Sequence, residues 1–291
     1  MLKPQFLNYV ENSFTLWLEN WILSKGSGFQ GVSSNFYPIG IQYGKYVYAS
    51  PYQPFVADES ISGNICPTGI YLSGSFVQRG QSGFLDYNYK RGLVYFSNFV
   101  GNHTKVSGSY SVSDVNVLPL DISEEKLLFE TKFELRKPNT SSISGLKKDS
   151  YTYPAIYIKA GESFENKPYS LGGEQLSEID IGLFIISDSA YQLSCLKSII
   201  ADSKEQIVGL LTSSPYNIYG GFSNTGQNYN YLTYSSGAKH YSGMYIKDVV
   251  VNTFNRQYNA DFNKLNPDVY YAVADLTICK PRLVRSNTNN L

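Results

Sequence analysis

Hydrophobic residues in the N-terminal segment recur with the period of a helix. Its large apolar residues follow one another at steps of four, four, three and four positions: Phe6, Val10, Phe14, Trp17 and Trp21. This spacing predicts an amphipathic helix that begins near Pro4, has Gly26 as its C-cap and, within residues 1–29, packs on the C-terminal domain. A helix lying on a membrane surface is the alternative, but the polar face carries acidic residues rather than Lys and Arg.

The pattern then changes to short apolar runs separated by turn residues. These runs predict strands at 46–49, 69–72, 75–78, 83–87, 93–96, 105–112 and 126–135. Gly92 is expected to supply a left-handed turn residue in a hairpin that joins residues 86–89 to residues 93–96. The spacing predicts an all-β module of sandwich or barrel type over residues 30–137, and we expect the polar residues 138–150 to be a linker.

Residues 151–285 combine strand patterns with a helical one. Strands are predicted at 155–159, 179–186, 207–211, 245–253 and 270–279, and the second of them is expected to be buried on both faces. Ser189 and Gln192 have the spacing of a capping box, and an apolar helix face follows them: Leu193, Leu196, Ile199 and Ile200.

These patterns together predict the fold class α+β. We expect an N-terminal helix, a C-terminal mixed or antiparallel sheet packed with helices, an inserted all-β module, and a C-terminal tail over residues 286–291.

Residues 212–243 are rich in tyrosine, glycine, serine and asparagine and show neither a helix nor a strand period. Their tyrosines are Tyr216, Tyr219, Tyr229, Tyr231, Tyr234 and Tyr241. We predict a long irregular loop, and long loops in compact domains are usually functional. Aromatic rings among small polar residues suit contact with another protein, packing of the loop on its own side chains, or binding of sugar rings.

The amino-acid composition argues against one class of binding partner, nucleic acid. The chain has 291 residues, and its 24 Lys and Arg balance its 24 Asp and Glu, so its formal net charge is zero. This balance argues against recognition of nucleic acid, which normally uses a basic surface. Aromatic residues make up 15% of the chain, which is typical of a β-rich protein.

Cysteine spacing and hydropathy bear on the compartment. Cys66, Cys195 and Cys279 stand alone, without the spacing of a disulfide framework or a zinc site, which favours a reducing compartment. No segment contains the roughly 20 apolar residues that cross a bilayer, and no export signal precedes the first helix. We therefore expect a protein that folds in solution, without a membrane partner.

Motifs for catalysis or cofactor binding are weak. Residues 26–31 formally match a dinucleotide-binding fingerprint, but the glycines follow a predicted helix rather than a strand. His103 and His240 lie in loop-like sequence, and the scattered carboxylates, such as Asp86 and Glu178, give no sign of a paired acid and base. We predict no catalytic residue, no cofactor and no metal site.

The second half of the chain, taken with the first helix, resembles the tail-terminator (tail-completion) proteins of long-tailed bacteriophages. Residues 154–158, which open with Pro-Ala, fit the opening strand of that family, and residues 161–165 with 171–173 fit its polar turn region. Residues 179–186, 191–202 and 270–278 take the places of its long strand, its helix and its closing strand. The resemblance covers about half of the chain, and the β module departs from it.

This resemblance implies a virion structural protein of the neck or tail, assembled in the host cytoplasm. Members of the family form a ring, usually a hexamer, that caps the tail tube and joins it to the head connector, with the sheath as a further neighbour. On this hypothesis the first helix, the tyrosine-rich loop and an edge strand carry the contacts between subunits, through Trp17, Trp21, Tyr216, Tyr219, Tyr229, Tyr231, Tyr234 and Tyr245. The alternative is a tail-fibre or adhesion subunit that binds carbohydrate.

Overall fold

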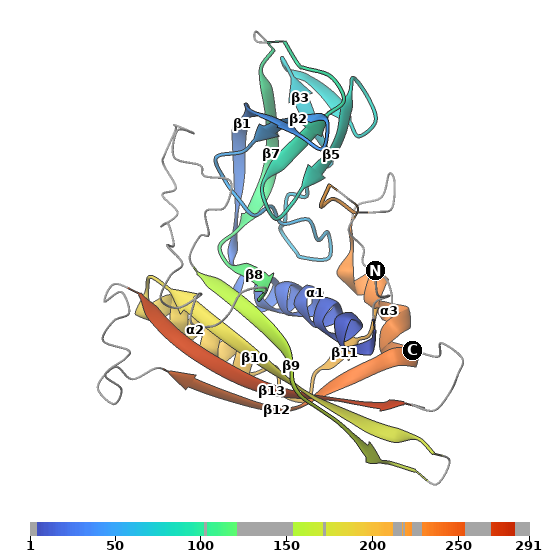
Figure 1. The fold of residues 1–291 in the computed structure, drawn as a ribbon. Helices are drawn as coiled ribbons and strands as arrows, with labels where there is room; N and C mark the ends of the chain where they lie inside the picture. Colours follow the sequence, from blue (N-terminus) through green and yellow to red (C-terminus); the bar gives the residue numbers. More distant parts are fainter. Residues whose placement is uncertain are drawn as a thin grey trace.

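The computed structural model describes residues 5–101, 104–120, 154–170, 173–211, 217, 219–222, 229–253 and 269–282. In this part of the chain the protein is mostly β, with two curled sheets. Figure 1 shows one sheet above the other, and α1 (Phe6–Gly26) lies between the upper sheet and the lower one. We call them the upper and the lower sheet below.

The predicted N-terminal helix is confirmed, and it buries its aromatic stripe. Phe14 and Trp17 are almost completely buried, and the Trp17 and Trp21 rings stack at 5.6 Å. The prediction of Gly26 as C-cap is wrong, because Ser27 takes the left-handed cap conformation with φ 47°. Gly26 instead allows a close approach, since a Cβ there would lie 3.0 Å from Cδ1 of Ile199. Pro4 lies outside the described residues.

The upper sheet has the strand order β4-β3-β7-β1-β2-β6-β5, and every pair in it is antiparallel. Its strands are β1 (Phe29–Gln42), β2 (Lys45–Ala49), β3 (Gly69–Leu72), β4 (Ser75–Gln78), β5 (Phe84–Asn88), β6 (Leu93–Phe96) and β7 (Val106–Ser113). The strands predicted from 46 to 112 are confirmed. Gly92 has φ 61°, as its expected turn position requires.

The apolar pattern of the sequence does not predict β1, which joins the two halves of the upper sheet. Its residues 29–36 pair with β7 and its residues 37–42 pair with β2. Phe36 is its one buried residue, and the apolar positions of its first half, at 29, 32 and 36, do not alternate with polar ones. The curl of the sheet encloses an aromatic core around Phe55 and Tyr110, whose ring centroids are 4.2 Å apart.

The lower sheet has the strand order β11-β12-β13-β10-β9-β8. Its strands are β8 (Asn116–Pro119), β9 (Ala155–Pro168), β10 (Gln175–Ser187), β11 (Ile207–Gly209), β12 (Gly243–Thr253) and β13 (Tyr270–Arg282). The β8–β9 pair is parallel and the other pairs are antiparallel, so of the two arrangements that the sequence left open, mixed or antiparallel, the described strands form a mixed sheet. The predicted strand 126–135 and linker 138–150 lie outside the described residues.

Two details of the lower sheet differ from the predictions. Residues 161–165 were expected in a polar turn, but they continue β9, where Gly161 at φ 82° lies in a bulge. Residues 231–242 were expected to be irregular, but they form the helix α3 (Tyr231–Ser242). Apolar periodicity does not predict α3; the Asn230 side chain caps it by accepting from the Thr233 N–H at 2.9 Å, and Tyr231 is buried in the lower core.

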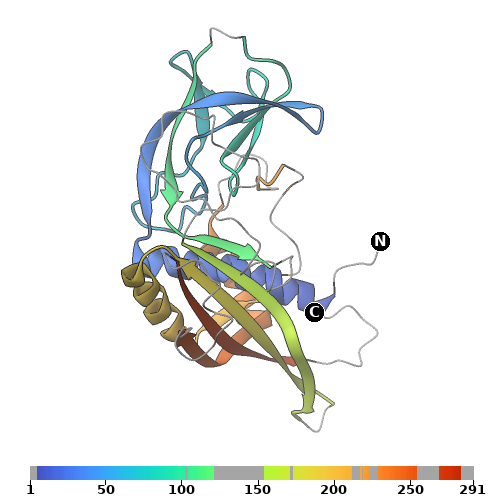
Figure 2. The ribbon, with the colours of Figure 1, turned by 60° about the vertical axis from the view of Figure 1, so that its left-hand side comes forward.

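The helices cover one face of the lower sheet, as the two views in Figures 1 and 2 show. The stripe of α1 packs on Ile158 and Leu183, and α2 (Ala190–Ala201) adds Leu196 to the same core. One half of the predicted capping box of α2 is confirmed, because Ser189 accepts a hydrogen bond from the Gln192 N–H at 3.5 Å. The other half is wrong, because the Ser189 N–H donates to the Ser187 hydroxyl at 3.1 Å and the Gln192 side chain accepts from that hydroxyl at 3.4 Å. We call this covered side the helix face and the other side the outer face.

The chain therefore leaves the lower layer after α1, builds the upper sheet and returns to the lower sheet at β8. None of the helices in the described ranges combines the length and the apolarity needed to cross a membrane.

Candidate assembly surface and module junction

The structure places the predicted contact residues in different environments. Trp17 and Tyr231 are 4% and 1% exposed, so each is part of the core. Half-buried positions are held by Trp21, Tyr219, Tyr229 and Tyr234. Tyr245, on β12, is 39% exposed and points to the outer face, whereas Tyr216 lies outside the described residues. Their role in subunit contacts stays a prediction. Among the described candidates, Tyr245 is the exposed one, so it is the first that could contact a partner directly.

The described part of the tyrosine-rich segment packs on the upper sheet. The Tyr219 ring lies 5.2 Å from the Tyr95 ring, and the Phe222 ring lies 5.1 Å from the Tyr89 ring. Phe222 also stacks on Tyr229 at 4.2 Å and is buried in the upper core. Three interpretations of this segment were open, and packing on the rest of the chain is the one that fits residues 217 and 219–222, which we call the strap.

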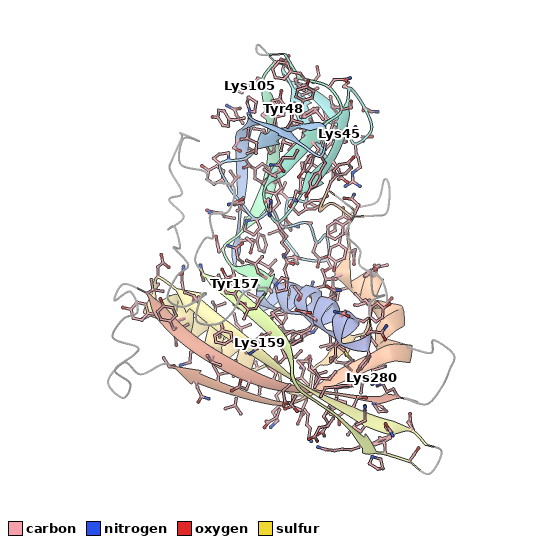
Figure 3. All side chains as sticks on the ribbon, in the orientation of Figure 1. Lys45, Tyr48, Lys105, Tyr157, Lys159 and Lys280 are labelled. Atoms are coloured by element: carbon pink, nitrogen blue, oxygen red, sulfur yellow. The ribbon has the colours of Figure 1, made fainter. Side chains whose placement is uncertain are left out.

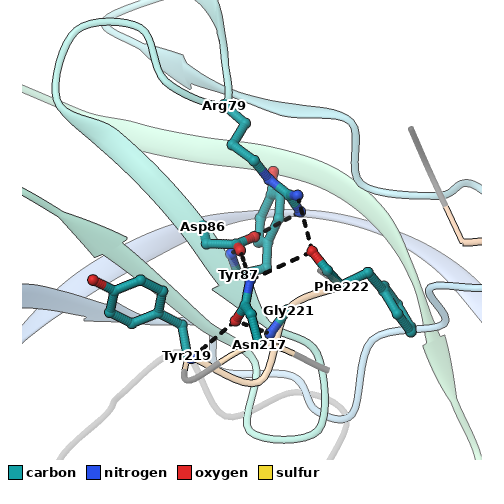
Figure 4. A network of polar contacts seen from close by, with 7 residues as sticks. All are labelled: Arg79, Asp86, Tyr87, Asn217, Tyr219, Gly221 and Phe222. Atoms are coloured by element: carbon teal, nitrogen blue, oxygen red, sulfur yellow. Dashed lines mark hydrogen bonds and ion pairs between the residues drawn. The ribbon is translucent and has the colours of Figure 1, made fainter. Parts of the chain in front are cut away.

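A buried carboxylate holds the strap in place (Figure 4). Asp86, on β5, is 3% exposed and forms an ion pair with Arg79 at 2.6 Å, while the Asn217 side-chain amide donates to its second oxygen. Burial raises the pKa of Asp86, although the amide of Asn217 and the charge of Arg79 act in the opposite direction. Gly221 completes the fit, because a Cβ there would lie 2.6 Å from the Asp86 carboxylate.

A second buried carboxylate joins the upper layer to α1 and α3. Asp58 accepts hydrogen bonds from the Asn20 amide at 2.7 Å, the Ser60 N–H at 2.9 Å and the Tyr231 N–H at 3.0 Å. Next to Asn20 in α1, Glu19 forms an ion pair with Lys90 at 2.6 Å. Because these groups come from distant parts of the chain, they fix the two layers relative to each other.

The outer face of the lower sheet carries an ion cluster around Glu178. Lys247 donates to one oxygen of the Glu178 carboxylate at 2.6 Å, and Lys167 donates to the other. These hydrogen bonds lower the pKa of Glu178 to about 2. The buried Cys279 thiol lies 3.8 Å from the same carboxylate, beside the exposed Tyr245.

Both edges of the lower sheet are only half covered by the strands that the structure describes. On one edge, β11 pairs with residues 243–245 of β12, and a bulge follows at Lys247. On the opposite edge, β8 pairs with residues 155–158 of β9, and the bulge at residues 161–163 follows. Beyond these bulges, residues 248–253 of β12 and 164–168 of β9 pair with described strands on one side only. We call these stretches the open segments.

The titrating groups do not converge on one point of the described structure. Asp86 and Glu178 lie in different layers, and each is paired with cationic side chains. The ranges described here contain no group of three His, Cys, Asp and Glu side chains placed to hold a metal ion. Burial raises the pKa of the Cys66 thiol to about 12, and the three cysteines are unbridged. The side chains of His103 and His240 lie outside the described part.

Comparison of the sequence with protein-family models and with curated proteins gives no match.

The sequence did not predict the open segments, the docking of the strap on Asp86, or the contacts that Asp58 and Lys90 make between the two layers. Asn217 and Gly221 belong to a turn-like sequence, so a tight turn was open to prediction, but its docking partner Asp86 lies far away in the chain. The open segments follow from which strands pair and where pairing stops, and a single sequence carries no signal for either.

Proposed function

We propose that this protein is a structural subunit of a tailed-phage virion that assembles into a homo-oligomeric, tail-terminator-like ring in the neck, between tail tube and head connector. The observation that carries the proposal is the lower sheet, which is covered by helices on one face and ends in open segments at both edges. Unpaired strand edges are templates for pairing with another chain, and soluble proteins normally protect them.

The order of elements adds support. Helix α1, strand β9, the hairpin to β10, helix α2 and the closing strand β13 follow one another as in the tail-terminator resemblance. The chain builds the upper sheet between α1 and β8, so we interpret residues 29–113 as an all-β insertion into a smaller α+β domain. Rings of this kind use heterologous contacts that close on a rotation axis.

The proposal is tested by the mass and shape of the purified protein at micromolar concentration. We expect native mass spectrometry to give a particle mass about six times that of one chain, and negative-stain electron microscopy to show closed rings. A second sample contains purified tail tubes in addition. A protein that stays monomeric in both samples contradicts the proposal.

One observation favours a second candidate, a carbohydrate-binding or adhesion subunit. In the turn that precedes Lys45 of the upper sheet (Figure 3), Tyr43 is 77% exposed. Phe99 is 48% exposed, and its ring lies 5.6 Å from the Tyr46 ring. Residues 29–57 and 93–113 contain no acidic residue. Exposed aromatic rings in a surface of low charge suit sugar rings. A glycan array separates the candidates: binding that is lost in Tyr43→Ala, and kept in the control Tyr191→Ala, favours this alternative.

A further inference from the structure

The two open segments, of six and five residues, lie at opposite edges of one sheet. Residues 248–253 of β12 and 164–168 of β9 each begin just beyond a bulge. Bulges commonly end pairing at a sheet edge, which fits the end of the β11 pairing just before the bulge in β12. Among the described strands, each copy thus presents one stretch on the β12 edge and one on the β9 edge that no other strand covers.

The strand directions are compatible with pairing between copies in the same orientation. β12 runs antiparallel to β13, β13 to β10 and β10 to β9, so β9 and β12 of one copy run in opposite directions. A second copy placed beside the first, without being turned over, therefore sets its β9 antiparallel to the first copy's β12. The joined sheets continue the antiparallel pattern that each has internally.

The offset of the two segments sets the tilt of such an assembly. Along β10, the β12 segment is centred level with Leu183 and the β9 segment level with Ser177, six residues apart. This offset is about 20 Å along the strands, and the four strands from β12 to β9 span about 19 Å across them. Pairing of successive copies then tilts the strands by about 45°, close to the tilt of roughly 35–45° in closed barrels. Six copies give a barrel about 50 Å across.

The side chains of the segments suit a covered edge. Val249 and Val251 are half-buried on the helix face, and Val250 is 49% exposed on the outer face. The facing strand brings Phe164, which is 38% exposed. Lys204, which pairs with Asp248 at 3.0 Å, lies at the edge on a flexible side chain that can move aside. A run of valines on a sheet edge is an aggregation site unless a partner strand covers it.

We propose that neighbouring copies join head to tail, with residues 248–253 of one copy pairing in antiparallel fashion with residues 164–168 of the next. The inference rests on the proposed ring and names the strands that form its contact. The ring wall is then a continuous sheet in which each copy supplies β12, β13, β10 and β9.

Cysteine cross-linking tests the contact in the full chain. In a Cys195→Ser background, Glu165→Cys is combined with Val250→Cys, or with Asn252→Cys to bracket the register, because all three positions lie on the outer face. The matched control combines Glu165→Cys with Val249→Cys, whose side chain lies on the helix face. Oxidation is followed by non-reducing gels, and electron microscopy records whether rings form.

We expect at least one of the two outer-face pairs to give a ladder of covalent oligomers that ends at the ring size, with at least tenfold less ladder from the control pair. Rings in the microscope without a ladder from either outer-face pair overturn the contact and leave the ring proposal standing. Efficient dimer formation by Val250→Cys alone also overturns it, because β12 then pairs with β12 of another copy. Monomers with and without tail tubes contradict both proposals.

Discussion

At the scale of single residues, buried polar groups decide how distant segments meet. Asp86 and Asp58 are each almost completely buried, and both are satisfied by donors from segments far away in the chain. A buried carboxylate is costly unless its oxygens accept hydrogen bonds, so each Asp selects the arrangement in which its donors arrive together.

The strap position is tested at Gly221. Substitution to Ala places a Cβ 2.6 Å from the Asp86 carboxylate, so the strap must move and the Asn217 bond to Asp86 must stretch. We expect Gly221→Ala to lower the free energy of unfolding by about 2 kcal/mol, measured by urea denaturation. Gly101→Ala is the control, because no heavy atom lies within 4 Å of a Cβ there. Equal stability of the two variants would argue against the docked strap.

Glu178 makes the stability depend on pH. Its pKa, about 2 in the folded protein, lies below the ordinary value of 4.5 because Lys167 and Lys247 donate to the carboxylate. The ionised group therefore stabilises the fold above its ordinary pKa, and this contribution is lost as the pH falls toward 2. Since water screens both lysines, we expect Glu178→Gln to cost about 1 kcal/mol at neutral pH and nothing near about pH 2.

Urea denaturation of wild type and Glu178→Gln at both pH values measures this difference. Glu165→Gln serves as the control, because that carboxylate is mostly exposed and lies 3.3 Å from Lys167. If wild type and Glu178→Gln differ in free energy of unfolding by the same amount at both pH values, the ionisation of Glu178 does not contribute to the pH dependence of stability.

At the scale of elements, α1 lies between the upper and the lower sheet and contacts both. Its apolar stripe packs on the helix face of the lower sheet, while Glu19 and Asn20 on its far side contact the upper layer. A helix of this kind gains most of its stability from tertiary packing rather than from intrinsic propensity.

Trp17 tests this anchoring role. It is 4% exposed and lies between Phe14 at 5.4 Å and Trp21 at 5.6 Å, so truncation leaves a large cavity. We expect Trp17→Ala to lower the free energy of unfolding by about 4 kcal/mol. Tyr191→Ala, at a position that is 79% exposed, should change it by less than about 0.5 kcal/mol. Thermal denaturation followed by circular dichroism compares the two, and similar melting temperatures would contradict the packing of α1.

At the scale of the whole molecule, two separate cores are held together by a polar junction. The lower core contains both tryptophans of the chain, whereas the upper core is rich in tyrosine and phenylalanine. The contacts of Asp58 and Lys90 run between the layers, so we expect them to couple the unfolding of the two cores.

This coupling is measurable with two spectroscopic probes. Tryptophan fluorescence reports on the lower core, and near-ultraviolet circular dichroism is dominated by the tyrosines. We expect the two unfolding curves to coincide in the wild type. Asp58→Ala leaves the Tyr231 N–H without its side-chain acceptor and the Asn20 amide with the Ser60 hydroxyl alone, so we expect it to cost about 3 kcal/mol and to separate the two midpoints. The control Asp248→Ala, at an exposed ion pair, should keep the curves together. Coincident curves in Asp58→Ala would show that the junction does not couple the cores.

What the sequence determined by itself is local. Periodicity was enough for α1, for β10 with burial on both faces, and for the strands of the upper sheet from 46 to 112, because each has a regular apolar pattern that neighbouring residues can satisfy. The Ser189 cap and the turn at Gly92 were predictable for the same reason, since each depends on residues a few positions apart.

Tertiary structure alone decided β1, α3, the docking of the strap and the position of the open segments. The first half of β1 has no apolar alternation, and the strand is held by ladder bonds to two different strands. Helix α3 depends on a cap and on the burial of Tyr231 in a distant core. Asp86 and Asn217 are 131 positions apart in the chain, and the open segments are defined by where β8 and β11 stop. Such features depend on which distant groups become neighbours, and the free energy of those contacts leaves no periodic trace along the chain.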